Sequence, residues 1–178
     1  GASGETNKAA SGTPNTIGIG ASQAWRLTSD ISNPTKLTDN VITTWTSIDS
    51  NQSYGQLGSL VSESSGIFSF SETGIYRVDS SLGGYVTGGS SHCRLFATSI
   101  LVTTDNSTYN LGMRGYTSIT YIGSNTFNGR TVISYLLDVT DTTNVKCKIA
   151  NFVDYTGNFL IYSGERSSNV IFTRLGDT

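Results

Sequence analysis

The sequence is poor in charge and in long apolar runs, and each shortage excludes a class of protein. Lys and Arg number 11 and Asp and Glu 13, so charged residues make up only 13% of the chain, against a usual share of roughly 25%. The net charge is −2, and no basic patch or arm is present to neutralise phosphates, which argues against a nucleic-acid partner. No stretch approaches the roughly 20 apolar residues of a membrane-spanning helix, and no basic amphipathic segment indicates a membrane partner.

The scarcity of histidine leaves little material for catalysis. His92 is the only histidine and stands next to Cys93, but neighbours in a strand point to opposite faces, which is the wrong geometry for a base and its nucleophile. The sequence has no phosphate-binding glycine loop, serine-nucleophile elbow or zinc-protease motif. We therefore predict that the chain is not an enzyme and that it needs no cofactor and no metal ion.

The two cysteines, Cys93 and Cys147, are too far apart in sequence for a metal-binding pair. They are either two small buried thiols or a disulfide. A disulfide between them would close a long loop and stabilise the fold by about 4 kcal/mol in the loop-entropy model. The sequence leaves both alternatives open.

What the chain does contain is Gly, Ser, Thr and Asn, arranged in two regions of different character. Residues 1–21 have few apolar side chains, and such a segment cannot bury enough surface to offset the entropy of ordering it. We therefore predict a flexible N-terminal arm or linker over residues 1–21. A single folded domain is predicted over residues 22–178.

Within that domain, short runs of β-branched and aromatic residues alternate with turn-forming clusters. In residues 66–71 the alternation places Phe68 and Phe70 on one face, and residues 75–82 alternate in the same way. Further candidate strands are residues 40–45, 94–103, 116–122, 131–139, 145–150, 159–162 and 169–175. Because no segment has a sustained helical period, about eight to ten strands predict an all-β sandwich or barrel.

The segment Gly66–Val78, which reads GIFSFSETGIYRV, resembles a hallmark of the complement one-q and tumour necrosis factor (TNF) superfamily. In that superfamily a Gly-x-Phe-x-apolar strand leads into a turn that ends in Gly, an apolar residue and Tyr, followed by a second strand. Residues 131–150 and 167–175 are similar to later strands of the same domain, so that the likeness covers residues 25–177. The resemblance implies a ten-strand jelly-roll β-sandwich that assembles into a homotrimer.

The abundance of Ser, Thr, Asn and Gly makes the chain most similar to the versions of this domain on phage and viral fibres. We therefore expect a non-enzymatic trimeric fibre head or capsid-decoration domain on the virion surface. The N-terminal arm would attach it to a virion fibre or capsid protein, and the head would bind a host surface receptor or glycan. The alternatives are a secreted complement-like or cytokine-like ligand-binding head and a small jelly-roll capsid protein.

Two sets of residues are candidates for binding. Tyrosine suits an interface because it combines a large area with a polar tip, and binding groups concentrate on loops above a rigid scaffold. The candidates for the trimer interface are Tyr76, Tyr116, Tyr121, Tyr135 and Phe172. The candidates for ligand-binding loops are Tyr54, Tyr85, Tyr155, Asn158 and Arg166.

Overall fold

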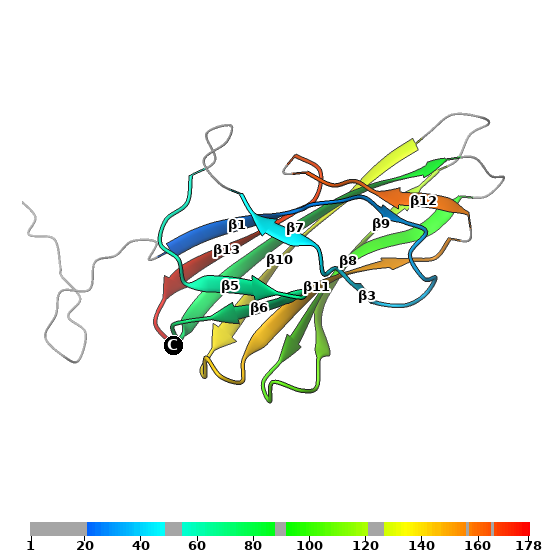
Figure 1. Ribbon diagram of the computed structural model, residues 1–178. Coiled ribbons are helices and arrows are strands. Elements are labelled where there is room, and N and C mark those ends of the chain that lie inside the picture. Colours follow the sequence, from blue (N-terminus) through cyan, green and yellow to red (C-terminus); the bar gives the residue numbers. More distant parts are fainter. Residues whose placement is uncertain (1–20, 49–54, 88–91, 121–126, 156, 165) are drawn as a thin grey trace, which may run out of the picture.

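The computed structural model describes residues 21–48, 55–87, 92–120, 127–155, 157–164 and 166–178 (Figure 1). In these ranges the chain forms strands, turns and bends, and the strands make two antiparallel sheets. The predicted all-β sandwich is therefore confirmed. The described part of the chain contains no helix long and apolar enough to cross a membrane.

The first sheet has five principal strands. They are, in spatial order, β4 (Trp45–Ser47), β1 (Ala21–Leu27), β13 (Asn169–Gly176), β7 (Gly74–Thr87) and β10 (Phe127–Val139). The long strand β7 pairs with β10 along one edge. Along its other edge it pairs first with β13 and then with the short strand β12 (Asn158–Ile161), which is bordered by β2 (Ile31–Ser32).

The second sheet also has five principal strands. Their order is β5 (Val61–Ser64), β6 (Ile67–Phe70), β11 (Lys146–Val153), β8 (Cys93–Thr103) and β9 (Asn110–Ile119). A two-residue strand, β3 (Asn40–Val41), pairs with β11 at its far end. The two sheets contain seven and six strands, and the five named first in each agree with the predicted ten-strand jelly roll.

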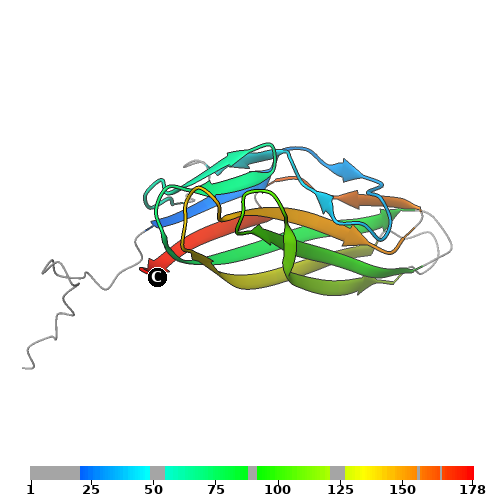
Figure 2. The same cartoon turned by 90° about the horizontal axis from the view of Figure 1, so that it is seen from below.

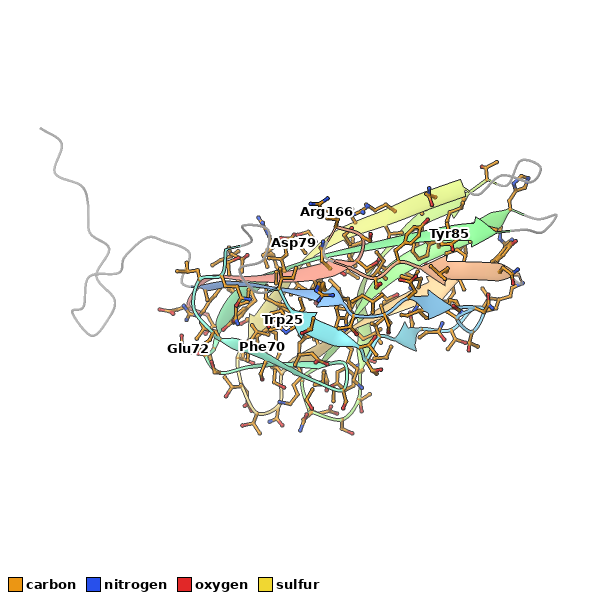
Figure 3. All side chains as sticks on the ribbon, turned by 45° about the horizontal axis from the view of Figure 1, so that its top comes forward. Trp25, Phe70, Glu72, Asp79, Tyr85 and Arg166 are labelled. Carbon is orange, nitrogen blue, oxygen red and sulfur yellow. The ribbon has the colours of Figure 1, made fainter. Side chains whose placement is uncertain are left out.

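The core lies between the two sheets, and the predicted alternation locates it correctly. Phe68 and Phe70 both point inward and are buried. The Phe68 ring lies 4.8 Å from that of Phe172 on β13, and the Phe70 ring lies 4.7 Å from that of Tyr76 on β7. Burial of a side chain such as Phe68 contributes roughly 2 kcal/mol, and tilted aromatic pairs add about 1 kcal/mol. Trp25, labelled with Phe70 in Figure 3, extends this aromatic cluster.

The prediction of one strand over residues 40–45 is wrong. The chain leaves the second sheet after β3 and joins the first sheet at β4, so the segment crosses between layers. Ile42 and Trp45 are both buried in the core, although a spacing of three cannot place two side chains on one face of a straight strand. The chain bends between them, and the Trp45 Nε1–H donates to the Ile42 carbonyl at 3.0 Å.

A disulfide between Cys93 and Cys147 is also excluded. Both cysteines are buried free thiols. Cys147 on β11 is opposite Val102 on β8, and Cys93 lies nine positions earlier on β8. At about 3.3 Å per residue the two thiols are separated by roughly 30 Å along the strand, whereas a disulfide needs Cα atoms less than about 7 Å apart.

The chain enters and leaves the sandwich at one end. Ala21, the last residue of the predicted arm, instead opens β1 and pairs with Arg174 near the end of β13. Figure 2 shows the end of β13 beside the start of β1. The rest of the predicted arm, residues 1–20, lies outside the described residues.

Candidate functional site

Strands β9 and β10, from opposite sheets, lie against each other and close one long edge of the sandwich. Glycines make this approach so close that a side chain would not fit. A Cβ atom at Gly129 would lie 2.6 Å from Cγ1 of Ile119, and one at Gly112 would lie 3.1 Å from the Tyr135 ring. A Cβ atom at Gly115 would overlap Cγ2 of Ile133.

This closed edge carries exposed apolar side chains. We call them the apolar edge, and they are Leu111, Met113, Tyr116, Val132 and Leu136, each 41–70% exposed. The glycine contacts place residue 112 opposite 135 and residue 115 opposite 133, so the two strands run side by side along this edge. Clustered exposed apolar residues of this kind mark interaction sites on soluble proteins.

The outward side of the first sheet is a second distinct surface. Its residues form two rows that cross the sheet from β10 through β7 and β13 to β1. The first row is Ser134, Asp79, Ile171 and Ala24, and the second is Leu136, Arg77, Thr173 and Ser22. We call these eight residues the sheet face. Half of them are Ser, Thr or Ala, and an ion pair within the set joins Arg77 Nε to Asp79 Oδ2 at 2.7 Å. Because Leu136 belongs to both surfaces, the apolar edge and the sheet face are continuous.

An aromatic pair lies on the same side of the sheet, farther along β7. The Tyr85 and Tyr162 rings are stacked with centroids 4.7 Å apart, and the Tyr162 hydroxyl donates to Oδ1 of Asn128. Burial raises the pKa of Tyr162, so its hydroxyl stays protonated and able to donate. Figure 3 places Tyr85 at the opposite end of the molecule from Glu72.

The predicted ligand-binding residues divide between surface and core. Tyr85 lies within β7 and not on a loop. Asn158 opens β12 and is exposed, and exposed Arg166 follows that strand, where its carbonyl accepts from Arg130 at 2.6 Å. Tyr155 is buried beside Phe159 in the core, so it offers no binding surface. Tyr54 lies outside the described residues.

The predicted interface residues divide in the same way. Tyr76 and Phe172 are 1% exposed and belong to the aromatic core, so they cannot contact another chain, and these two assignments are wrong. Tyr135 is half-buried against the core, with its ring over Gly112. Tyr116 is exposed on the apolar edge, and Tyr121 lies outside the described residues.

The side chains beside His92 do not form a nucleophilic site. His92 is exposed whereas Cys93 is buried, as expected for neighbours at the start of a strand. Burial raises the pKa of the Cys93 thiol to about 11, which keeps it protonated near neutral pH. Within the described ranges, no three His, Cys, Asp or Glu side chains come together in a group that could hold a metal ion.

Comparison of the fold with solved structures gives clear likenesses. Eiger TNF from S. frugiperda matches with a TM-score of 0.62 at 10% identity, over 88% of this chain and 93% of that one. Murine APRIL, in a crystal structure at pH 5.0, matches with a TM-score of 0.58 at 10% identity, over 87% and 98%. A scan of protein-family models and a search of curated proteins give no match. The chain therefore has a TNF-like jelly-roll fold.

Proposed function

We propose that this chain is a non-catalytic, ligand-like head that assembles as a homotrimer and binds a receptor on a cell surface. The observation that carries the proposal is the apolar edge, where five large apolar side chains on two glycine-fitted strands face solvent. The TNF-like fold supports it, because the resemblance of residues 66–78 to that superfamily implies a trimer.

The two surfaces suit a ring of copies. The apolar edge exposes large apolar side chains, whereas half of the residues in the sheet-face rows are Ser, Thr or Ala. Contact between two different surfaces of identical chains is head-to-tail, and it closes into a ring when the rotation per copy divides a full turn. If Leu136 and Val132 of one copy packed against the sheet face of the next copy, their side chains would be removed from water. Burial of apolar surface is the main driving force of such association.

Two settings remain for this head. The neutral, hydroxyl-rich composition supports a fibre head or capsid decoration on a virion surface, joined to the particle through residues 1–20. The TNF-like fold fits a secreted, cytokine-like ligand equally well. The mass of the native assembly separates a free trimer from a virion-bound head, and a closed shell of many copies would indicate the capsid alternative.

The trimer is tested by Leu136→Asp. A carboxylate at this position would be buried without a partner in the ring, which weakens each contact by on the order of 3 kcal/mol, or about a hundredfold. In analytical ultracentrifugation we expect wild type to sediment at three times 18.9 kDa and Leu136→Asp to sediment as a monomer.

Leu37→Asp is the matched control, because Leu37 is similarly exposed but lies beside β11 and belongs to neither surface. It should remain a trimer. Wild type that stays monomeric at high concentration, or a Leu136→Asp variant that stays trimeric, contradicts the proposal.

A further inference from the structure

Leu37 combines two features that a leucine rarely shows together. Its backbone is left-handed, with φ of 55°, and its side chain is 53% exposed. A bulky side chain in this region of φ crowds its own backbone, which makes the conformation an outlier. Exposure means that burial of the side chain does not compensate for the strain.

The surrounding contacts hold Leu37 in this conformation. Its N–H donates to the Val153 carbonyl at 2.8 Å. The Asn40 side chain closes the preceding loop, because its Nδ2 donates to the carbonyls of Thr35 and Thr38, each at 2.9 Å. Strain of this kind persists only where neighbours over-determine it, and it concentrates at functional sites.

The far end of the same segment is fixed to the second sheet. Asp39 Oδ1 accepts a hydrogen bond from the buried Ser99 hydroxyl at 2.8 Å, and its other carboxylate oxygen pairs with Arg114. Arg114 in turn lies over the Phe152 ring, 4.3 Å from its centroid. Leu37 is therefore presented on a rigid support, so that a contact made there would require no further ordering of the backbone.

Two cations bind Asp154, which follows the Val153 whose carbonyl accepts from Leu37. Lys36 Nζ lies 3.0 Å from Asp154 Oδ1, and Arg94 Nε lies 2.8 Å from Asp154 Oδ2. The Asp154 side chain is nearly buried, whereas that of Arg94 is 76% exposed. Lys36 and Arg94 share the single carboxylate of Asp154, so the three side chains together carry one positive charge. The chain as a whole has a net charge of −2. We call Leu37, Lys36 and Arg94 the Leu37 patch.

We propose that the Leu37 patch is the contact for a protein partner that offers an apolar pocket rimmed by Asp or Glu. An apolar centre with a basic rim has the composition of interface hot spots, where Arg is enriched. The positive rim selects an acidic partner and accelerates encounter with it. The inference rests on the proposed function, since it names the surface with which the head meets its partner.

A random peptide library displayed on phage, selected on the immobilised protein, is the probe. We expect the enriched peptides to combine an apolar residue with neighbouring Asp or Glu and to lose affinity at high salt. Leu37→Asp should weaken their binding at least about tenfold, because a carboxylate replaces the apolar centre and repels the acidic rim. Leu57→Asp is the control: it alters another exposed leucine on β1's margin and should leave binding unchanged.

A second variant separates a binding role from a structural one. In Leu37→Gly the left-handed backbone is no longer strained, so the urea midpoint should stay the same or rise while peptide binding falls as in Leu37→Asp. A lowered midpoint would assign Leu37 to the stability of the loop and overturn the inference. The inference would also be overturned if the enriched peptides lacked acidic residues, or if they bound Leu37→Asp as tightly as wild type.

Sedimentation of the same samples keeps this inference apart from the trimer. Wild type, Leu37→Asp and Leu37→Gly should all sediment as the same assembly. A monomeric wild type that still enriches acidic peptides at Leu37 would refute the trimer and retain the patch. A trimeric wild type that enriches no acidic peptides would retain the trimer and refute the Leu37 patch.

Discussion

Asp105 shows how one carboxylate can organise a turn, here between β8 and β9. Its Oδ1 accepts hydrogen bonds from the backbone N–H groups of Ser107 at 2.9 Å and Thr108 at 2.7 Å. The Thr103 hydroxyl donates to the same oxygen at 2.7 Å. All three bonds favour the charged form, and the Thr103 hydroxyl, followed by the two backbone N–H groups, lowers the pKa of Asp105 from 3.8 to about 2.

This shift predicts a loss of stability in acid. The folded pKa lies below the unfolded one, so the contribution of Asp105 is complete above pH 3.8 and is lost as the pH falls toward about 2. Asp105→Asn cannot titrate, and urea midpoints measured against pH should therefore fall less steeply over this window than those of wild type. Equal slopes for the two proteins would show that Asp105 does not carry the effect.

Single residues also show which contacts could not be predicted from the sequence. Alternation separates the two faces of a strand, but it could not tell a face covered by the second sheet from a face covered by another copy, and Tyr76 and Phe172 were therefore wrongly assigned to the trimer interface. Leu37 gave no signal at all, because it stands outside every alternating run and its importance depends on a backbone angle and on contacts to distant Val153 and Asp154.

At the scale of elements, the packing of β9 against β10 depends on glycines. The Gly115 position touches Ile133 so closely that any side chain there must displace it. The sequence predicted strands over residues 116–122 and 131–139. In the structure the first runs earlier, over 110–119, and the second begins earlier, over 127–139. Their packing against each other was not predicted, because contacts between sheets leave no periodic signal in either strand.

Gly115→Ala tests this close approach. The added methyl group forces Ile133 or β9 to move, and overpacking of this kind destabilises by about 1–3 kcal/mol. Urea unfolding gives the change in free energy. Gly55→Ala is the matched control, since a Cβ at Gly55 meets nothing within 4 Å. If both variants lost the same stability, the effect would come from replacing glycine and not from the contact.

At the scale of the whole molecule, the last strand completes the centre of a sheet. β13 lies between β1 and β7, and its Phe172 packs against Trp25 from the other end of the chain. Such distant pairing cannot form until nearly the whole domain is present, which slows folding and makes it cooperative. The alternation of residues 169–175 was enough to predict a strand. Its position at the centre of a sheet could be seen only in the folded structure.

A chain that ends at Ser168 should therefore fail to fold. Without β13, strands β1 and β7 lose their shared neighbour and the core loses Val170 and Phe172. We expect circular dichroism to show no cooperative thermal transition for this chain. A chain that ends at Gly176 keeps β13 whole and should unfold cooperatively, and a native-like transition in the shorter chain would contradict the central role of β13.

The pairing of Ala21 with Arg174 brings entry and exit to one pole of the domain. In a ring of parallel copies, every terminus would emerge at that pole. Short flexible linkers from residue 178 of one copy to residue 21 of the next could then encode the whole assembly as a single polypeptide. In such a chain each of the three units could be altered independently, leaving the opposite pole of every unit free for binding.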